Sequence, residues 1–148
     1  NGVSYPASIK DTIVFKKEGY PNFLKDIQGI SYAEKKGRWT DAELNQNAIF
    51  TFKEPLPTKF KLEIVCKAYN RDKNENVVKV KVGDSIREFK ADHENSDKYT
   101  LEFDNNQNSN IIEIAPPKPF EPTEKLEGSD TRKRGIFLVS LKIIDMKK

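Results

Sequence analysis

The sequence contains few of the residues that most often carry catalysis or bind metals. It has one cysteine, Cys66, and one histidine, His93. A single cysteine excludes an internal disulfide, and the lack of a second cysteine or histidine removes the usual spacings of a zinc site. No glycine-rich phosphate loop occurs, and no run approaches the roughly 18 apolar residues of a membrane span. We therefore expect no metal, no cofactor and no membrane insertion by this domain.

The sequence also lacks a large excess of positive or negative charge. The 26 basic residues nearly balance the 23 acidic ones, which leaves a formal net charge of +3. A nucleic-acid-binding protein normally shows a clustered basic face, so we expect no nucleic-acid partner. The chain has nine Phe, five Tyr and clear apolar runs, which argue against disorder. The length of 148 residues predicts one domain. The first residue, Asn1, indicates either a removed leader or a domain cut from a longer protein, and we expect the cut domain.

The single cysteine and the single histidine do not support a catalytic interpretation. Alternation in residues 61–69 places Cys66 on one face with Leu62 and Ile64, which predicts a buried thiol and not a nucleophile. His93 lies in a polar loop, where we expect exposure to solvent, and no nucleophile-elbow pattern precedes any serine. Residues 104–108 lack the glycine and final glutamate of an EF-hand loop, so we interpret them as a hairpin turn and not as a calcium site.

Short alternating or β-branched runs dominate the rest of the chain. They predict strands near residues 12–16, 48–53, 60–69, 77–82, 86–90, 99–103, 111–114 and 135–144. Residues 23–30 fit either one helical turn or a short strand around 27–32, and the four prolines within 115–123 predict a crossing loop. The nearly continuous apolar run at 135–144 predicts a central strand covered on both faces.

About eight strands with turn-rich connections predict an all-β fold. The pattern is typical of a β-sandwich or jelly roll of antiparallel strands, with at most one or two short helical turns. We expect residues 1–148 to form a single β-sandwich domain.

Two polar stretches, residues 34–41 and 128–135, are predicted to be loops that meet at one end of the sandwich. The first contains Trp39, the only tryptophan, whose ring offers a flat face to the C–H groups of a sugar. Arg38 and Asp41 beside it supply a hydrogen-bond donor and an acceptor for hydroxyl groups. The second loop supplies an opposite wall of charged side chains, namely Asp130, Arg132 and Arg134. The alternative is structural: Trp39 plugs the core, and an Arg–Asp salt bridge ties the loops together.

The motifs resemble a known family. They lie at residues 13–21, 37–41, 52–57, 112–117 and 129–136. The most specific are Gly-Arg-Trp-Thr-Asp at 37–41 and the Asp-x-Arg-x-x-Gly-Ile pattern at 130–136. They resemble a small β-sandwich domain at the C-terminal end of bacterial membrane-bound phosphoglycerol transferases and related surface-glycan enzymes. Arg134 stands where the resemblance leads us to expect Leu, which adds a basic group to the site.

The resemblance implies a periplasmic, non-catalytic accessory module attached to a catalytic domain outside this chain. Two hypotheses follow. In the first, the module binds or positions a glycan, such as a periplasmic glucan, through the six residues of the two loops. In the second, it is a structural module that docks on the attached catalytic domain, with Trp39 buried and an apolar patch exposed along residues 116–122. A third, a free-standing enzyme, is the least favoured by the sequence.

Overall fold

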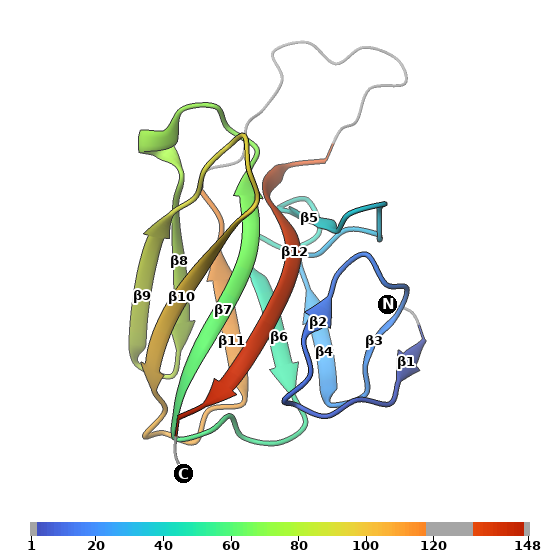
Figure 1. Cartoon of the computed structure of the whole chain (residues 1–148), viewed down its shortest axis with the longest axis vertical. Helices are drawn as coiled ribbons and strands as arrows, with labels where there is room; N and C mark the ends of the chain where they lie inside the picture. The colour runs from blue at the N-terminus through green and yellow to red at the C-terminus, as the bar shows by residue number, and fades with distance from the viewer. Residues whose placement is uncertain (1–2, 118–131, 147–148) are drawn as a thin grey trace.

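The computed structural model describes residues 3–117 and 132–146, and it confirms the all-β prediction. Two five-stranded sheets pack face to face as a β-sandwich (Figure 1). The first sheet runs in the order β10 (Asp97–Asp104), β7 (Lys59–Ala68), β12 (Arg134–Asp145) and β2 (Ile13–Val14), with β5 (Arg38–Asp41) also paired to β12. The second runs β4 (Leu24–Gln28), β6 (Ala48–Phe52), β11 (Ile111–Ala115), β8 (Val77–Val82) and β9 (Ser85–Lys90).

Strand pairing within both sheets is antiparallel. A small parallel pair, β1 (Ser4–Tyr5) with β3 (Tyr20–Pro21), lies beside the sandwich. A single 3₁₀ turn, η1 (Lys73–Glu75), lies between β7 and β8. Over residues 3–117 and 132–146 no helix has the length and apolar character needed to cross a membrane.

The core forms because alternate residues of the long strands point into the space between the sheets. In β7 every even-numbered residue is buried, while the odd-numbered ones are partly or fully exposed. Phe60, Leu62, Ile64 and Cys66 have no exposed surface, which confirms the predicted buried thiol. Burial raises the pKa of Cys66 to about 12, so the thiol stays neutral at physiological pH.

β12 is the central strand that its sequence predicts. It pairs with β7 along one edge and with β2 and β5 along the other. Ile136, Phe137 and Leu138 are consecutive and all buried, because this part of the strand is covered on both faces.

Three sequence predictions need correction. Residues 34–41 are not entirely a loop, since Arg38–Asp41 form β5. Of the two alternatives left open for residues 23–30, the structure forms the strand, β4, which begins at Leu24 and overlaps the predicted range of 27–32 only at residues 27 and 28. Residues 104–108 form a turn but not a hairpin, because β10 and β11 belong to different sheets. The crossing loop predicted for 115–123 lies mostly outside the described residues.

Candidate functional site

An aromatic and basic row crosses the outer face of the first sheet. Trp39 on β5 is the register partner of Phe137 on β12, which is in turn the partner of Lys67 on β7. The Trp39 and Phe137 ring centroids are 5.0 Å apart, and the Lys67 amine lies 5.6 Å from the Phe137 ring. Because the neighbouring residues Cys66 and Leu138 point into the core, this row faces away from it.

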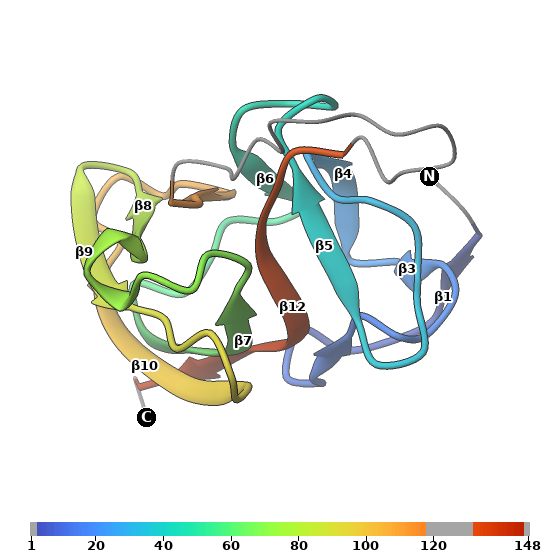
Figure 2. The same ribbon diagram turned by 90° about the horizontal axis from the view of Figure 1, so that it is seen from above.

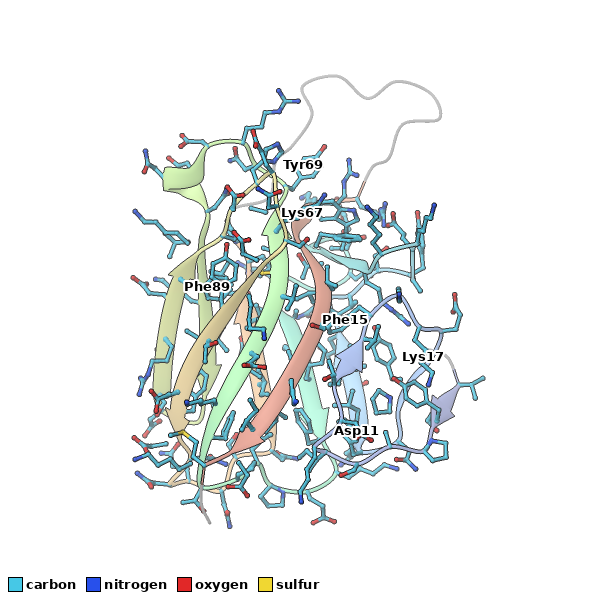
Figure 3. The ribbon with its side chains drawn as sticks, in the orientation of Figure 1. Asp11, Phe15, Lys17, Lys67, Tyr69 and Phe89 are labelled. Carbon is cyan, nitrogen blue, oxygen red and sulfur yellow. The ribbon has the colours of Figure 1, made fainter. Side chains whose placement is uncertain are left out.

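A hollow of about 550 Å³ opens beside this row, and we call it the aromatic hollow. Its lining residues are Trp39, Lys67, Ala68, Tyr69, Asn70, Arg71 and His93. Figure 3 shows Lys67 and Tyr69 together at the upper end of β7. The volume lies within the range of about 300–1,000 Å³ that is usual for small-molecule sites. An aromatic wall edged by amide, imidazole and cationic groups suits a ligand with both C–H surface and hydroxyl groups.

Trp39 is half-buried and held by its neighbours. Its ring contacts Tyr69 edge-on, with centroids 5.4 Å apart and planes at 84°. The Arg134 guanidinium lies 4.3 Å from the Tyr69 ring and 5.4 Å from the Trp39 ring, and it donates a hydrogen bond of 2.9 Å to the Tyr69 hydroxyl. The structure therefore brings two predicted site residues, Trp39 and Arg134, together.

Arg38 lies on the opposite face of β5 from Trp39, because successive residues of a strand point to opposite sides. Only 5% of Arg38 is exposed. Its guanidinium donates hydrogen bonds to the carbonyl oxygens of Phe15, Lys17 and Gly19 at 2.8, 2.9 and 3.1 Å. It also stacks 4.3 Å from the Tyr20 ring. Arg38 thus fixes the segment after β2 and does not line the aromatic hollow.

Tyr20 shows the electrostatic effect of this arrangement. Burial raises the pKa of the Tyr20 phenol, and the Arg38 charge lowers it in part.

Asp41 is likewise buried and bonded to backbone. Its Oδ1 accepts hydrogen bonds of 3.0 Å from the backbone N–H groups of Glu43 and Lys133. The neighbouring Thr40 hydroxyl accepts a bond of 3.0 Å from the Ile136 N–H. These contacts join β5 to the start of β12.

Arg132 points to the residues before β5. It donates hydrogen bonds to the Ser31 hydroxyl at 2.9 Å and to the Glu34 carboxylate at 3.0 Å, and it lies 4.7 Å from the Tyr32 ring. The described part of the second predicted loop therefore does meet the first. Among the described residues, the Arg132–Glu34 ion pair and the hydrogen bond from the Lys133 N–H to Asp41 join the two stretches. Asp130 lies outside the described residues.

A ligand-binding role for the six predicted residues stays a prediction. Of the five that the structure describes, Trp39 lines the aromatic hollow and Arg134 contacts two of its lining rings, Trp39 and Tyr69. Lys67 and Tyr69 were not predicted to belong to the site, although both are outward residues at the end of the alternating run 61–69, Lys67 within β7 and Tyr69 directly after it. The same is true of His93, which is half-buried and lines the hollow, with Nδ1 3.4 Å from the Ala68 carbonyl oxygen. The expectation of a solvent-exposed histidine is corrected, because the loop after β9 folds over the end of β7.

Fold and site together define an all-β sandwich domain with an aromatic hollow on the outer face of one sheet. Residues 1–145 match a family described as Domain of unknown function (DUF7024), and the chain belongs to that family.

The chain is also similar to named enzymes. It is 35% identical over 147 residues to Phosphoglycerol transferase I of Salmonella choleraesuis (strain SC-B67) and, equally, to the protein of the same name from Salmonella typhi. Each alignment covers 99% of this chain but 19% of the relative, so the chain spans about a fifth of the length of these proteins. The family resemblance predicted from the motifs is confirmed.

Proposed function

We propose that this domain is a non-catalytic accessory module of a phosphoglycerol transferase-like enzyme, and that it binds a carbohydrate in the aromatic hollow. The observation that supports this most directly is the placement of Trp39, half-buried and held by Tyr69, Phe137 and Arg134 at the wall of a hollow of about 550 Å³. A plug of the core would lie between the two sheets, whereas the Trp39 ring lies against Phe137 on the outer face of the first sheet.

The chemistry of the lining suits a sugar. Aromatic rings cover the apolar face of a pyranose, while Asn70, Arg71 and His93 supply hydrogen-bonding groups for its hydroxyls. The affinity of such a site is modest, but a module attached to an enzyme needs only a weak site, since linkage raises the effective ligand concentration to the millimolar range. In this proposal the parent enzyme is anchored in a bacterial inner membrane and the module works on its periplasmic side, where it presents a glucan to the catalytic domain.

The test is a titration of the chain with β-linked glucose oligosaccharides, followed by Trp39 fluorescence and by calorimetry. Saturable binding is expected, with an emission change. Trp39→Leu is expected to weaken calorimetric affinity by about tenfold, the loss expected from one aromatic contact. Tyr32→Ala is the matched control, because Tyr32 is 65% exposed and lies outside the hollow. No heat and no emission change with any glucan would refute the proposal.

A docking role is the second candidate function, and two exposed side chains favour it. Tyr32 and Leu44 are 65% and 61% exposed, and both lie close in sequence to β5. In this candidate function, these two exposed side chains contact the attached catalytic domain. A Tyr32→Ala/Leu44→Ala variant of the full enzyme would then lose activity while its isolated module bound glucan normally. Under the glycan proposal, the Trp39→Leu variant loses activity instead.

A further inference from the structure

A second hollow, which we call the lysine groove, adjoins the aromatic hollow. Its volume is about 820 Å³. Four lysines line it, against one acidic side chain: Lys16, Lys35, Lys36, Lys67 and Glu94. The groove therefore has a strong local excess of positive charge, whereas the chain as a whole is nearly balanced, with 26 basic and 23 acidic residues.

The four lysines keep their charge available to a ligand. In residues 3–117 and 132–146 the ion pairs are Lys98 with Glu63, Arg132 with Glu34 and Lys133 with Glu43, and the groove lysines form none of them. The groove also offers neutral hydrogen-bond donors, the hydroxyls of Thr12, Ser96 and Ser140 and the amide of Asn95. Lysine ammonium groups and hydroxyl donors together match the needs of an oxyanion.

The two hollows share a wall. Lys67 lines both of them. Phe137 lines the lysine groove, and its ring contacts Trp39 of the aromatic hollow. The groove extends from this wall over β12 toward β2, strands that lie side by side in Figure 1. A ligand in the aromatic hollow that carries a side group can therefore reach the lysines without leaving the sheet face.

We propose that the lysine groove binds an anionic substituent of the glycan held in the aromatic hollow, so that the preferred ligand is an oligosaccharide bearing a phosphate ester or a similar acidic group. This inference rests on the proposed glycan function and adds its substrate class. The sugar contacts Trp39 and Tyr69, and the acidic group lies among Lys16, Lys35, Lys36 and Lys67.

The experiment compares two probes by calorimetry at low ionic strength: a β-linked glucose oligosaccharide and the same oligosaccharide carrying one phosphate ester. The phosphorylated probe is expected to bind about tenfold more tightly, and 0.5 M NaCl is expected to remove most of that preference, because salt screens partly exposed charges.

Two charge-matched variants locate the effect. Lys35→Gln/Lys36→Gln is expected to weaken binding of the phosphorylated probe about three- to tenfold and to leave the neutral probe unchanged. Lys79→Gln/Lys81→Gln removes the same charge from exposed positions on β8 in the other sheet, and it is expected to change neither affinity. Both pairs are exposed, so thermal melting is expected to show intact folding in each variant.

The outcomes separate the two proposals. Equal affinity for the two probes overturns the lysine-groove proposal and leaves the glycan function standing. Failure of both probes to bind overturns both. Inorganic phosphate that binds as tightly as the phosphorylated oligosaccharide shows an isolated anion site and overturns the link to a glycan. The chain could also bind vesicles of anionic phospholipid but not the phosphorylated probe. That result assigns the lysines to a membrane surface and overturns the lysine-groove proposal.

Discussion

Arg38 and Trp39 are adjacent in sequence but have different roles, because their side chains leave β5 on opposite faces. Trp39 lines the aromatic hollow, while Arg38 is buried against the segment after β2. A guanidinium can serve several backbone acceptors at once, since its donors form a fixed planar fork. Three carbonyl oxygens between residues 15 and 19 depend on this one side chain.

Arg38→Met is therefore expected to destabilise the fold. The substitution keeps the length and apolar stem of the side chain but leaves buried carbonyl groups without donors, which costs about 2–4 kcal/mol in unfolding free energy. Urea denaturation followed by Trp39 fluorescence measures the loss. Arg71→Met is the matched control, because Arg71 is exposed and its loss is expected to change stability by less than about 0.5 kcal/mol. Equal stability of the two variants would contradict a structural role for Arg38.

At the scale of elements, the strand β5 forms backbone hydrogen bonds to both sheets. It pairs with β12 in the first sheet, and its backbone also bonds to the residues that follow β4 in the second. Figure 2 shows β5 between β12 and β4. Gly37 immediately precedes this strand, and a Cβ there would overlap the Leu138 carbonyl oxygen of β12. The glycine in the Gly-Arg-Trp-Thr-Asp motif thus permits β5 to approach β12 closely.

Gly37→Ala is expected to push β5 away from β12. Because the obstructing atom belongs to the backbone, it cannot rotate aside, and the overlap is expected to cost about 1–3 kcal/mol. The displaced strand carries Trp39, so glucan affinity is expected to fall together with the melting temperature. Lys36→Ala, at the exposed neighbouring position, serves as the control for stability. A Gly37→Ala variant as stable as Lys36→Ala would show that β5 does not need the close approach.

The sequence predicted the long elements well and the short ones poorly. β7, β8 and β12 carry an alternating or continuous apolar pattern over 10, 6 and 12 residues, long enough to reveal which residues are buried. β5 has four residues, two of them charged, so its pattern predicts a loop. Its strand conformation comes from pairing with β12, a contact about a hundred positions away in sequence.

The site was predictable only in part, because some of its residues come together through contacts that are distant in sequence. Trp39 and Arg134 were predicted as site residues because Trp39 is the only tryptophan and Arg134 replaces an expected Leu, each within a specific motif. Lys67 and His93 join the hollow only through the pairing of β7 with β12 and the approach of the 91–97 loop to the end of β7. Residue type alone does not determine such contacts, so the sequence placed Arg38 at the site and left out Tyr69.

At the scale of the whole molecule, the two sheets share one core. Its buried cluster draws Leu62 and Leu138 from the first sheet and Val80 and Ile114 from the second. Between the layers, the rings of Phe15 and Phe50 meet edge-on with centroids 5.9 Å apart. Neither sheet can lose its partner without exposing this apolar surface to water. Burial of that surface is the main driving force for folding. Separate unfolding of one sheet is therefore unfavourable.

The domain is accordingly expected to unfold in a single cooperative transition. Trp39 reports on the first sheet and on β5, whereas far-ultraviolet circular dichroism reports on all strands. In a urea titration the two signals are expected to give the same midpoint and the same slope, as a two-state transition of a domain of this size requires. Hydrogen exchange then places the most protected amides in β7, β11 and β12 together, because these strands lie inside the two sheets. Two separated midpoints, with Trp39 changing first, would instead show that β5 and the aromatic hollow open independently of the core, and glucan would then be expected to shift only that first transition.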